Sequence, residues 1–245
     1  IWLQVKKTLI GRTPEDSQIL RSAVLRSPMT IWQSLDQWQF PMVDKDCCVV
    51  SKGIGTFHIR KRTDDLFHAL PMQEPAVETA IRSLLRPGDT FVDAGANIGF
   101  YTVLASQLVG TQGHAIAFEM IPTTAEMLRL HVSQNGCVNA EVVEGALAET
   151  SEMILKASIL AGKSGQASIA RNFGAEDIEV KTITLAEQLT DYSSIRLIKM
   201  DLEGAELGAL RGLGKDLVKV QAIIFENRGA EDVVDYLTQH GFQIS

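Results

Sequence analysis

The chain has 245 residues, of which 45% are hydrophobic and 22% charged, and its formal net charge is −7 with a sequence pI near 5.3. This composition is typical of a globular protein, and the acidic balance argues against a nucleic-acid surface, which needs an excess of lysine and arginine. No hydrophobic run has the length of a membrane span, and three cysteines without a CxxC pair favour the cytoplasm over an oxidising compartment.

Residues 1–70 are expected to form an irregular N-terminal extension. A helix is expected within residues 1–25, interrupted at Pro14, and two short strands over 47–50 and 56–60 form a predicted hairpin. The extension fits a lid over the rest of the chain or a dimerisation arm, so both a monomer and a homodimer are left open.

From residue 71 to 245, strands and helices alternate. Strands are expected at 90–94, 115–119, 141–143, 195–201 and 220–225, and helices at 75–85, 98–108, 122–134, 205–213 and 231–240. The strands are nearly continuous hydrophobic runs, typical of a parallel sheet that is covered on both faces. We therefore predict a doubly wound α/β domain, interrupted by β segments over 153–160 and 178–183, which binds its ligand at the carboxyl edge of the sheet.

The turn after the first of these strands reads DAGANIG. Gly95 allows a sharp turn and a close approach of ligand, Ala96 is also small, and Gly99 allows tight helix packing. The following helix start is expected to offer free N–H groups. Asn97 stands where a dinucleotide-binding turn has its second glycine, which argues against a pyrophosphate, and Asp93 suits a cationic group. A nucleoside with a positively charged amino-acid tail meets both conditions; the alternative is an ordinary strand–helix turn.

The next two strands also end in candidate binding residues. Glu119 ends the second strand, where a carboxylate can accept hydrogen bonds from two ribose hydroxyls, and Met120 follows it. Glu144, Gly145 and Ala146 close the third strand and are expected to border an adenine. A chance surface position is the alternative for Glu119.

The fourth strand ends in the charged block KMDLEGAE. Lys199 and Asp201 alternate to the same strand face, and charges in such a place must be paired or must meet a ligand. We expect Asp201 to take a proton from the acceptor or to bind a metal, and Lys199 to stabilise the developing oxyanion. Glu203 is a third catalytic candidate, whereas Glu206 is interpreted as a first-turn helix acid.

The blocks DAGANIG, AFE and KMDLEGAE resemble the defining blocks of the FkbM family of S-adenosylmethionine (SAM) dependent methyltransferases, and the likeness covers roughly residues 56–228. Arg60, Asp64 and Asp65 resemble the upstream positions of the family more loosely. The resemblance implies a Rossmann-like class I methyltransferase fold, SAM as cofactor, and methyl transfer to a hydroxyl oxygen of a small molecule or a sugar-containing acceptor.

Several hypotheses remain beside this one. Asp201, Glu226 and Asn227 resemble the magnesium ligands of catechol-type O-methyltransferases, which makes Mg²⁺ a hypothesis. Among the histidines, His68 is the candidate for a base. The competing functions are an NAD(P)-dependent oxidoreductase and a non-catalytic binding protein on a methyltransferase fold.

Overall fold

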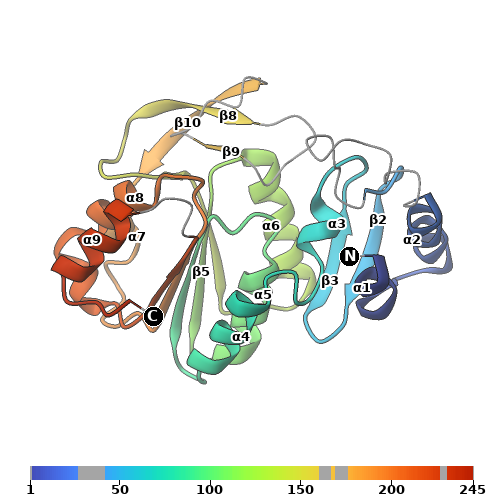
Figure 1. The fold of residues 1–245 in the computed structure, drawn as a ribbon, viewed down its shortest axis with the longest axis horizontal. Coiled ribbons are helices and arrows are strands. Elements are labelled where there is room, and N and C mark those ends of the chain that lie inside the picture. Colours follow the sequence, from blue (N-terminus) through green and yellow to red (C-terminus); the bar gives the residue numbers. More distant parts are fainter. Residues whose placement is uncertain (1, 27–41, 160–166, 169–175, 227–230, 245) are drawn as a thin grey trace.

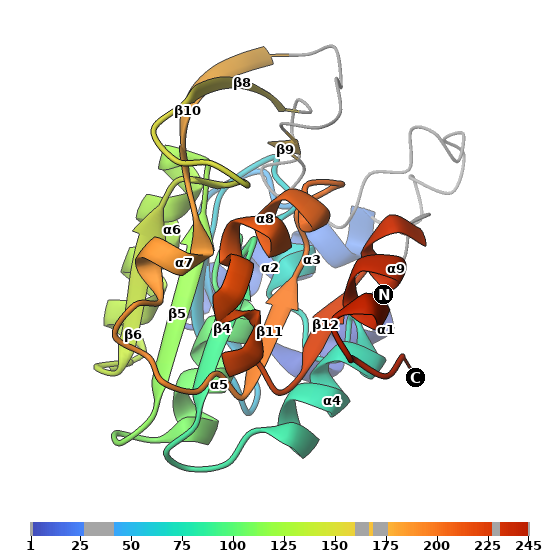
Figure 2. The same cartoon turned by 90° about the vertical axis from the view of Figure 1, so that its left-hand side faces the viewer.

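The computed structural model describes residues 2–26, 42–159, 167–168, 176–226 and 231–244. Within them, the central sheet has five parallel strands in the order β12-β11-β4-β5-β6 (Figures 1 and 2). These strands are β4 (Thr90–Ala94), β5 (His114–Glu119), β6 (Ala140–Glu144), β11 (Leu197–Met200) and β12 (Ile223–Phe225). The predicted doubly wound, parallel α/β fold is confirmed.

Successive side chains of the strands point to opposite faces of the sheet, and a separate hydrophobic cluster covers each face. Phe91 and Leu197 belong to one cluster, whereas Val92 and Ile198 belong to the other. The first cluster includes residues of α4 (Pro75–Leu84), α5 (Phe100–Val109) and α6 (Pro122–Gln134). The second includes residues of α7 (Leu185–Gln188), α8 (Glu206–Leu213), the 3₁₀ helix η3 (Gly214–Lys219) and α9 (Glu231–Gln239). Figure 1 shows the two helix layers on either side of the sheet.

The N-terminal part forms a third layer outside α6 (Figure 1). It contains α1 (Trp2–Thr8), β1 (Leu9–Gly11), α2 (Pro14–Arg26), β2 (Cys47–Ser51), β3 (Gly55–Ile59) and α3 (Asp65–His68). The three strands pair antiparallel, and Phe57 of β3 stacks on Phe100 with 6.0 Å between ring centroids. The predicted hairpin is confirmed, whereas the expected helix over 1–25 is two helices separated by β1. The role of this layer as a lid or dimerisation arm stays a prediction.

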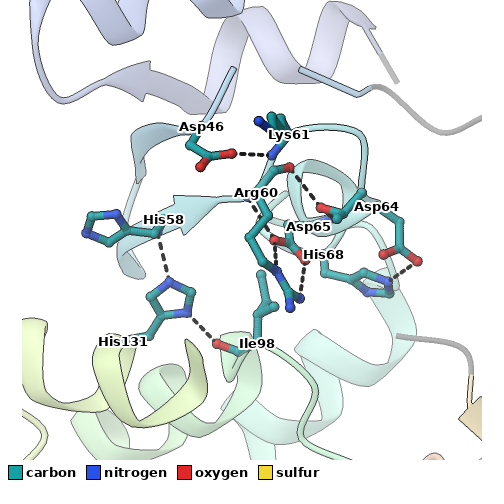
Figure 3. Close-up of polar contacts among 10 residues, drawn as sticks. Asp46, His58, Arg60, Lys61, Asp64, Asp65, His68, Ile98 and His131 are labelled. Carbon is teal, nitrogen blue, oxygen red and sulfur yellow. Dashed lines mark hydrogen bonds and ion pairs between the residues drawn. The ribbon is translucent and has the colours of Figure 1, made fainter. Parts of the chain in front are cut away.

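The buried ring of His131, on α6, joins the N-terminal layer to the turn after β4 (Figure 3). Its Nε2 accepts a hydrogen bond from the backbone N–H of His58 at 2.8 Å, and its Nδ1 donates to the carbonyl of Ile98 at 2.7 Å. Burial lowers the pKa of His131 to about 4, although the bond to Ile98 opposes this. The neutral ring therefore fixes the position of β3 relative to the start of α5.

A small mixed sheet in the order β7-β10-β8-β9 follows β6, the edge strand of the central sheet, along the chain. Its strands are β7 (Ala146–Leu147), β8 (Ile154–Ile159), β9 (Ala167–Ser168) and β10 (Glu176–Ile183). The strands β8 and β10 agree with the two β segments predicted here, whereas β7 and β9 were not predicted. Figures 1 and 2 both show the β8–β10 pair above the central sheet. Among the described residues, no helix has both the length and the hydrophobicity that a bilayer crossing requires.

The remaining predicted helices agree with the structure to within a few residues. The clearest difference is at α5, which begins at Phe100 and not at residue 98, because Gly99 adopts a left-handed conformation with φ of 88° at the N-cap. Two single-turn helices, α3 and α7, were not predicted, since one turn is too short to show a helical period.

Candidate active site

A cavity lies at the carboxyl edge of the central sheet, beside the point where the chain order of the strands reverses between β4 and β11. Ligands of open α/β sheets bind at such points. It is lined by Asp64, Phe67, His68, Gln73, Glu74, Gly95, Asn97, Phe118, Glu119, Met120, Ile121, Gly145, Ala146, Leu147, Asp201, Leu202, Glu203, Ala205 and Glu226. Six of the predicted cofactor positions therefore share one cavity with Asp201 and Glu203: Gly95, Asn97, Glu119, Met120, Gly145 and Ala146. Ala96 and Gly99 do not line it.

The glycines of the turn after β4 are required by the protein itself. Gly95 has φ of 79°, and a Cβ there would collide with the carbonyl oxygen of Asp201. Gly99 packs as expected, since a Cβ would meet the side chain of Leu128 on α6. The space that a Cβ would need at Gly95 is thus occupied by the main chain at Asp201. Gly95 also lines the cavity, and the close approach of a ligand to it stays a prediction.

The first amides of this turn have partners within the protein. The N–H groups of Gly95 and Ala96 both donate to the carbonyl of Phe118, at 3.0 and 2.9 Å, and the N–H of Asn97 donates to Glu119 Oε2 at 2.9 Å. These three amides are therefore used within the protein. The free N–H groups were predicted for the start of the helix that follows them, and that expectation stays a prediction.

Glu119 is buried, with 7% of its surface exposed, and it lines the cavity. Its Oε1 accepts from the N–H of Ile121 at 2.9 Å, and Oε2 accepts from Asn97. Burial raises the pKa of Glu119 to about 7, although these two backbone hydrogen bonds oppose the rise. Each carboxylate oxygen has a second lone pair, so the group can still accept hydrogen bonds from a ligand.

Two side-chain oxygens on the cavity wall are buried and have no hydrogen-bond partner among the residues that the structure describes. They are Asn97 Oδ1 and Gln73 Oε1. A buried acceptor without a donor destabilises a protein by about 1–3 kcal/mol. A ligand that donates hydrogen bonds to both would remove this penalty, so the two oxygens indicate a binding site.

Lys199 lies in register with Asp93 on the neighbouring strand and holds the polar network behind the cavity. Its Nζ donates to the carbonyl of Gly95 at 3.1 Å and lies 3.6 Å from Asp93 Oδ1 and 3.7 Å from Asp201 Oδ2. It also lies 5.6 Å from the ring centroid of Tyr101. The predicted proximity of Lys199 and Asp201 is present, and Lys199 is also bound to the main chain of the turn.

The charges of this network support one another. Burial lowers the pKa of Lys199, but Asp93 and Asp201 raise it more, so the net shift is upward. Burial raises the pKa of Asp93, against the opposing effects of Lys199 and of Thr102, whose hydroxyl donates to Asp93 Oδ2 at 2.7 Å. Neither Asp93 nor Lys199 lines the cavity. Their contacts with cofactor and acceptor stay predictions.

The other predicted residues divide between the cavity and the surface. Glu203 lines the cavity with φ of 50°, whereas Glu206 accepts from the N–H of Leu202 at 2.9 Å, as a helix acid. Glu144 points away from the cavity and pairs with the exposed Arg129 at 3.1 Å. Its neighbours Gly145 and Ala146 do line the cavity, as does Met120.

The magnesium hypothesis finds no support in the described residues. Asp201 and Glu226 both line the cavity, but Asn227 lies outside the described residues. Over the described part of the chain, no group of three or more histidine, cysteine, aspartate or glutamate side chains could hold a metal ion.

Asp64, Phe67 and His68 of the N-terminal layer also line the cavity. Figure 3 shows the polar contacts that hold this segment. Arg60 Nε and Nη2 donate to Asp65 at 2.8 and 2.9 Å, and the Arg60 N–H donates to the same carboxylate at 3.0 Å. Gln73 and Glu74, which also line the cavity, were not identified from the sequence. Glu74 accepts a hydrogen bond from the hydroxyl of Tyr101 at 2.9 Å. The only feature of the sequence that marks these two residues is their position before the proline that begins α4.

Comparison with known proteins matches residues 93–244 to the profile of the methyltransferase FkbM domain. An arsenite methyltransferase of Halobacterium salinarum is 39% identical over 57 residues, which are 23% of this chain and 15% of that protein. Protein-L-isoaspartate O-methyltransferase 2 of Archaeoglobus fulgidus is 34% identical over 61 residues, 25% of this chain and 28% of that protein. The matched stretches thus span less than a third of these relatives.

Solved structures give a similar result. A precorrin-6y C5,15-methyltransferase of Geobacter metallireducens superposes with a TM-score of 0.47 at 14% identity, over 71% of this chain and 75% of that one. A methyltransferase FkbM of Methylobacillus flagellatus superposes with a TM-score of 0.44 at 17% identity, over 71% of this chain and 45% of that one. At these scores, the fold assignment rests on the sheet topology described above and on the matched domain.

Proposed function

The chain belongs to the FkbM family of SAM-dependent methyltransferases, and we propose that it transfers the methyl group to a hydroxyl oxygen of a small molecule or a sugar-containing acceptor. One observation carries this proposal: Asn97 and Glu119 line the same cavity as Asp201 and Glu203. A cofactor bound at Asn97 and Glu119 would share the cavity with the carboxylates of Asp201 and Glu203. Carboxylates accept hydrogen bonds from hydroxyl groups, so these two can hold a hydroxyl acceptor beside the cofactor.

Side chains of the cavity account for the binding of SAM. Glu119 is proposed to accept hydrogen bonds from the ribose hydroxyls. The partnerless oxygens of Asn97 and Gln73 are proposed to accept N–H groups of the cofactor. Gly145 and Ala146 are proposed to border the adenine, since both line the cavity beside Glu119.

When bound, SAM supplies a methyl group that is already activated by its sulfonium, so the protein has chiefly to position the acceptor oxygen. Good alignment can contribute about 7–11 kcal/mol to lowering such a barrier. Asp201 and Glu203 are proposed to hold the acceptor hydroxyl. Lys199 contacts both Asp201 and the carbonyl of Gly95. It therefore fixes the position of the Asp201 carboxylate relative to the turn after β4.

The experiment is to incubate the purified protein with methyl-labelled SAM and a panel of monosaccharides, disaccharides and phenols, and to identify the labelled bond by mass spectrometry and NMR. We expect an O-methyl ether together with S-adenosylhomocysteine. A product methylated on nitrogen or carbon would contradict the proposal. Binding of SAM without S-adenosylhomocysteine formation on any acceptor would support the non-catalytic alternative.

Two further measurements separate the roles. Asp201→Asn is expected to lower turnover with the best acceptor of the panel, and unchanged turnover would remove Asp201 from the mechanism. Magnesium, as a hypothesis, predicts loss of activity after exhaustive EDTA treatment and its recovery with added Mg²⁺. Activity that survives the treatment would count against the cation.

A further inference from the structure

The loop between β3 and α4 places a histidine and a buried aspartate on the cavity wall. His68 is the last residue of α3 and Asp64 is its N-cap. Both line the cavity, with side-chain exposures of 24% for His68 and 1% for Asp64. A partly exposed histidine held by a buried carboxylate is one arrangement in which histidine acts as a general base.

The geometry fixes the ring of His68. Its Nε2 donates to Asp64 Oδ2 at 3.3 Å, and Figure 3 shows the ring turned toward this carboxylate. The carbonyl of Asp64 accepts from the N–H groups of Phe67 and His68, at 2.8 and 3.2 Å, and the ring of Phe67 meets that of His68 edge-on at 5.5 Å. Because the Nε2 proton faces a carboxylate, the lone pair of the neutral ring resides on Nδ1.

The neighbouring ion pair makes the two adjacent acids different. Asp65 is fully buried and accepts three hydrogen bonds from Arg60. This pair anchors the loop that carries Asp64 and His68. The sequence pair DD therefore divides into an anchor and a partner for the histidine.

We propose that His68 is the general base of the reaction and that Asp64 is its positioning residue. This inference rests on the proposed hydroxyl acceptor. The hydroxyl oxygen forms a bond to the methyl carbon, the carbon–sulfur bond breaks, and its electron pair remains on sulfur. The hydroxyl proton passes to Nδ1 of His68, and the resulting imidazolium is stabilised by the carboxylate of Asp64 until the proton leaves to water.

Asp201 is less suited to this step than His68. Its carboxylate lies 3.7 Å from the ammonium of Lys199 and is 40% exposed. A proton on Asp201 would remove one counter-charge from buried Lys199, whereas a proton on His68 creates an ion pair with Asp64. Protonation of Asp201 therefore weakens the Lys199 network, whereas protonation of His68 strengthens the contact between His68 and Asp64.

The test compares His68→Gln with His114→Gln, in the full chain and with the best hydroxyl acceptor of the panel described above. His114 is exposed at the opposite end of the sheet, at the start of β5, and is the matched control. For His68→Gln we expect kcat to fall about 10²–10⁴-fold, with SAM affinity by calorimetry changed less than about twofold. In a His68→Gly variant, added imidazole should restore part of the lost turnover.

The role of Asp64 needs a measurement that distinguishes it from a merely structural effect on the loop. Asp64→Asn is expected to lower kcat with KM for the acceptor unchanged, and Asp64→Glu to restore part of the loss. Histidine ¹⁵N NMR of the S-adenosylhomocysteine complex should show His68 protonated on Nε2 in the wild type. A ring protonated on Nδ1 would overturn the assignment.

The outcomes separate this inference from the function on which it rests. Two results would contradict the role of His68 as general base: an O-methyl ether formed at an unchanged rate by His68→Gln, or a His68→Gly variant that imidazole does not rescue. Both results would leave the proposed hydroxyl acceptor unaffected. Methylation of nitrogen or carbon throughout the panel would defeat the proposed function itself.

Discussion

The two walls of the cavity are held together in different ways. The strand-end wall, comprising Gly95, Asn97, Glu119 and Asp201, is fixed largely by main-chain bonds, such as the bond from the Asp201 N–H to the Ala94 carbonyl at 3.0 Å. The outer wall, comprising Asp64, His68, Gln73 and Glu74, follows the antiparallel N-terminal layer. Its fixed points are side-chain contacts, among them Arg60 with Asp65 and Tyr101 with Glu74.

This difference separates what the fold requires from what it permits. The strand-end wall cannot change without disturbing the parallel sheet, whereas a few substitutions can reshape the outer wall. We therefore expect differences in acceptor between related proteins to depend on the positions equivalent to 60–75. The following predictions test the contrast.

The largest effect is expected from Gly95→Ala on the strand-end wall. A Cβ would collide with the Asp201 carbonyl at positive φ, and strain plus overpacking should lower the free energy of unfolding by roughly 4 kcal/mol. Urea denaturation measures it. The control is Gly136→Ala, also at positive φ but with open space around it, for which about 1 kcal/mol is expected. Equal losses in the two variants would contradict a wall fixed by close main-chain packing.

Protonation of His131 should loosen the contact between the two walls. The folded-state pKa of about 4 lies below the ordinary 6.5, so the unfolded chain binds the proton more readily. This contribution is intact above pH 6.5 and is lost as the pH falls toward 4, by about 3 kcal/mol. Urea denaturation across this range is the measurement. His131→Gln should start less stable and decline less steeply; parallel pH curves would exclude His131 as the cause.

On the outer wall, Asp65→Asn removes the charge that anchors Arg60. We expect the free energy of unfolding to fall by about 2–3 kcal/mol, the usual effect of losing a charge-assisted hydrogen bond in a buried place. Glu144→Gln is the matched change in the exposed pair with Arg129, for which less than about 1 kcal/mol is expected. If both variants lose equally little, side-chain pairs do not hold the outer wall.

The smallest effect concerns cofactor affinity. Because the pKa of Glu119 is about 7 and hydroxyl donors favour its charged form, SAM binding should release a proton. Calorimetry is expected to show affinity about tenfold weaker at pH 6 than at pH 8. Glu119→Gln should lose most of this dependence. A wild-type affinity that follows the same pH curve as the variant would show that Glu119 does not meet the ribose.

Much of the fold follows from the sequence, because its information is local. A hydrophobic strand such as 90–94, bounded by Pro87-Gly88 and by the DAGANIG turn, can be recognised from its own residues without knowledge of tertiary contacts. The parallel-sheet rule then brings Glu119 and Asp201 to one edge. Helix α3 escaped prediction because a single turn shows no period, and the break between α1 and α2 depends on β1 pairing with the distant β2.

The site was less predictable, because its details are decided by contacts between distant segments. No pattern reveals that the Gly95 amide is used by Phe118, or that the Asp201 carbonyl occupies the space a Cβ at Gly95 would need. Gln73 and Glu74 line the cavity from the segment before α4, where Glu74 accepts a hydrogen bond from Tyr101 of α5. Charged residues at strand ends were visible in the sequence; their partners were not.

The link through His131 limits how this protein can be recombined with its relatives. A hybrid that joins a foreign N-terminal part, up to about residue 70, to the rest of this chain must supply a main-chain N–H opposite the imidazole of His131, where His58 supplies it here. Without that donor, the imidazole would keep its hydrogen bond to Ile98 but lose its second hydrogen bond, and the position of the grafted part relative to α6 would be less well fixed. Productive crossover points therefore preserve the strand that carries residue 58 together with the helix that carries residue 131.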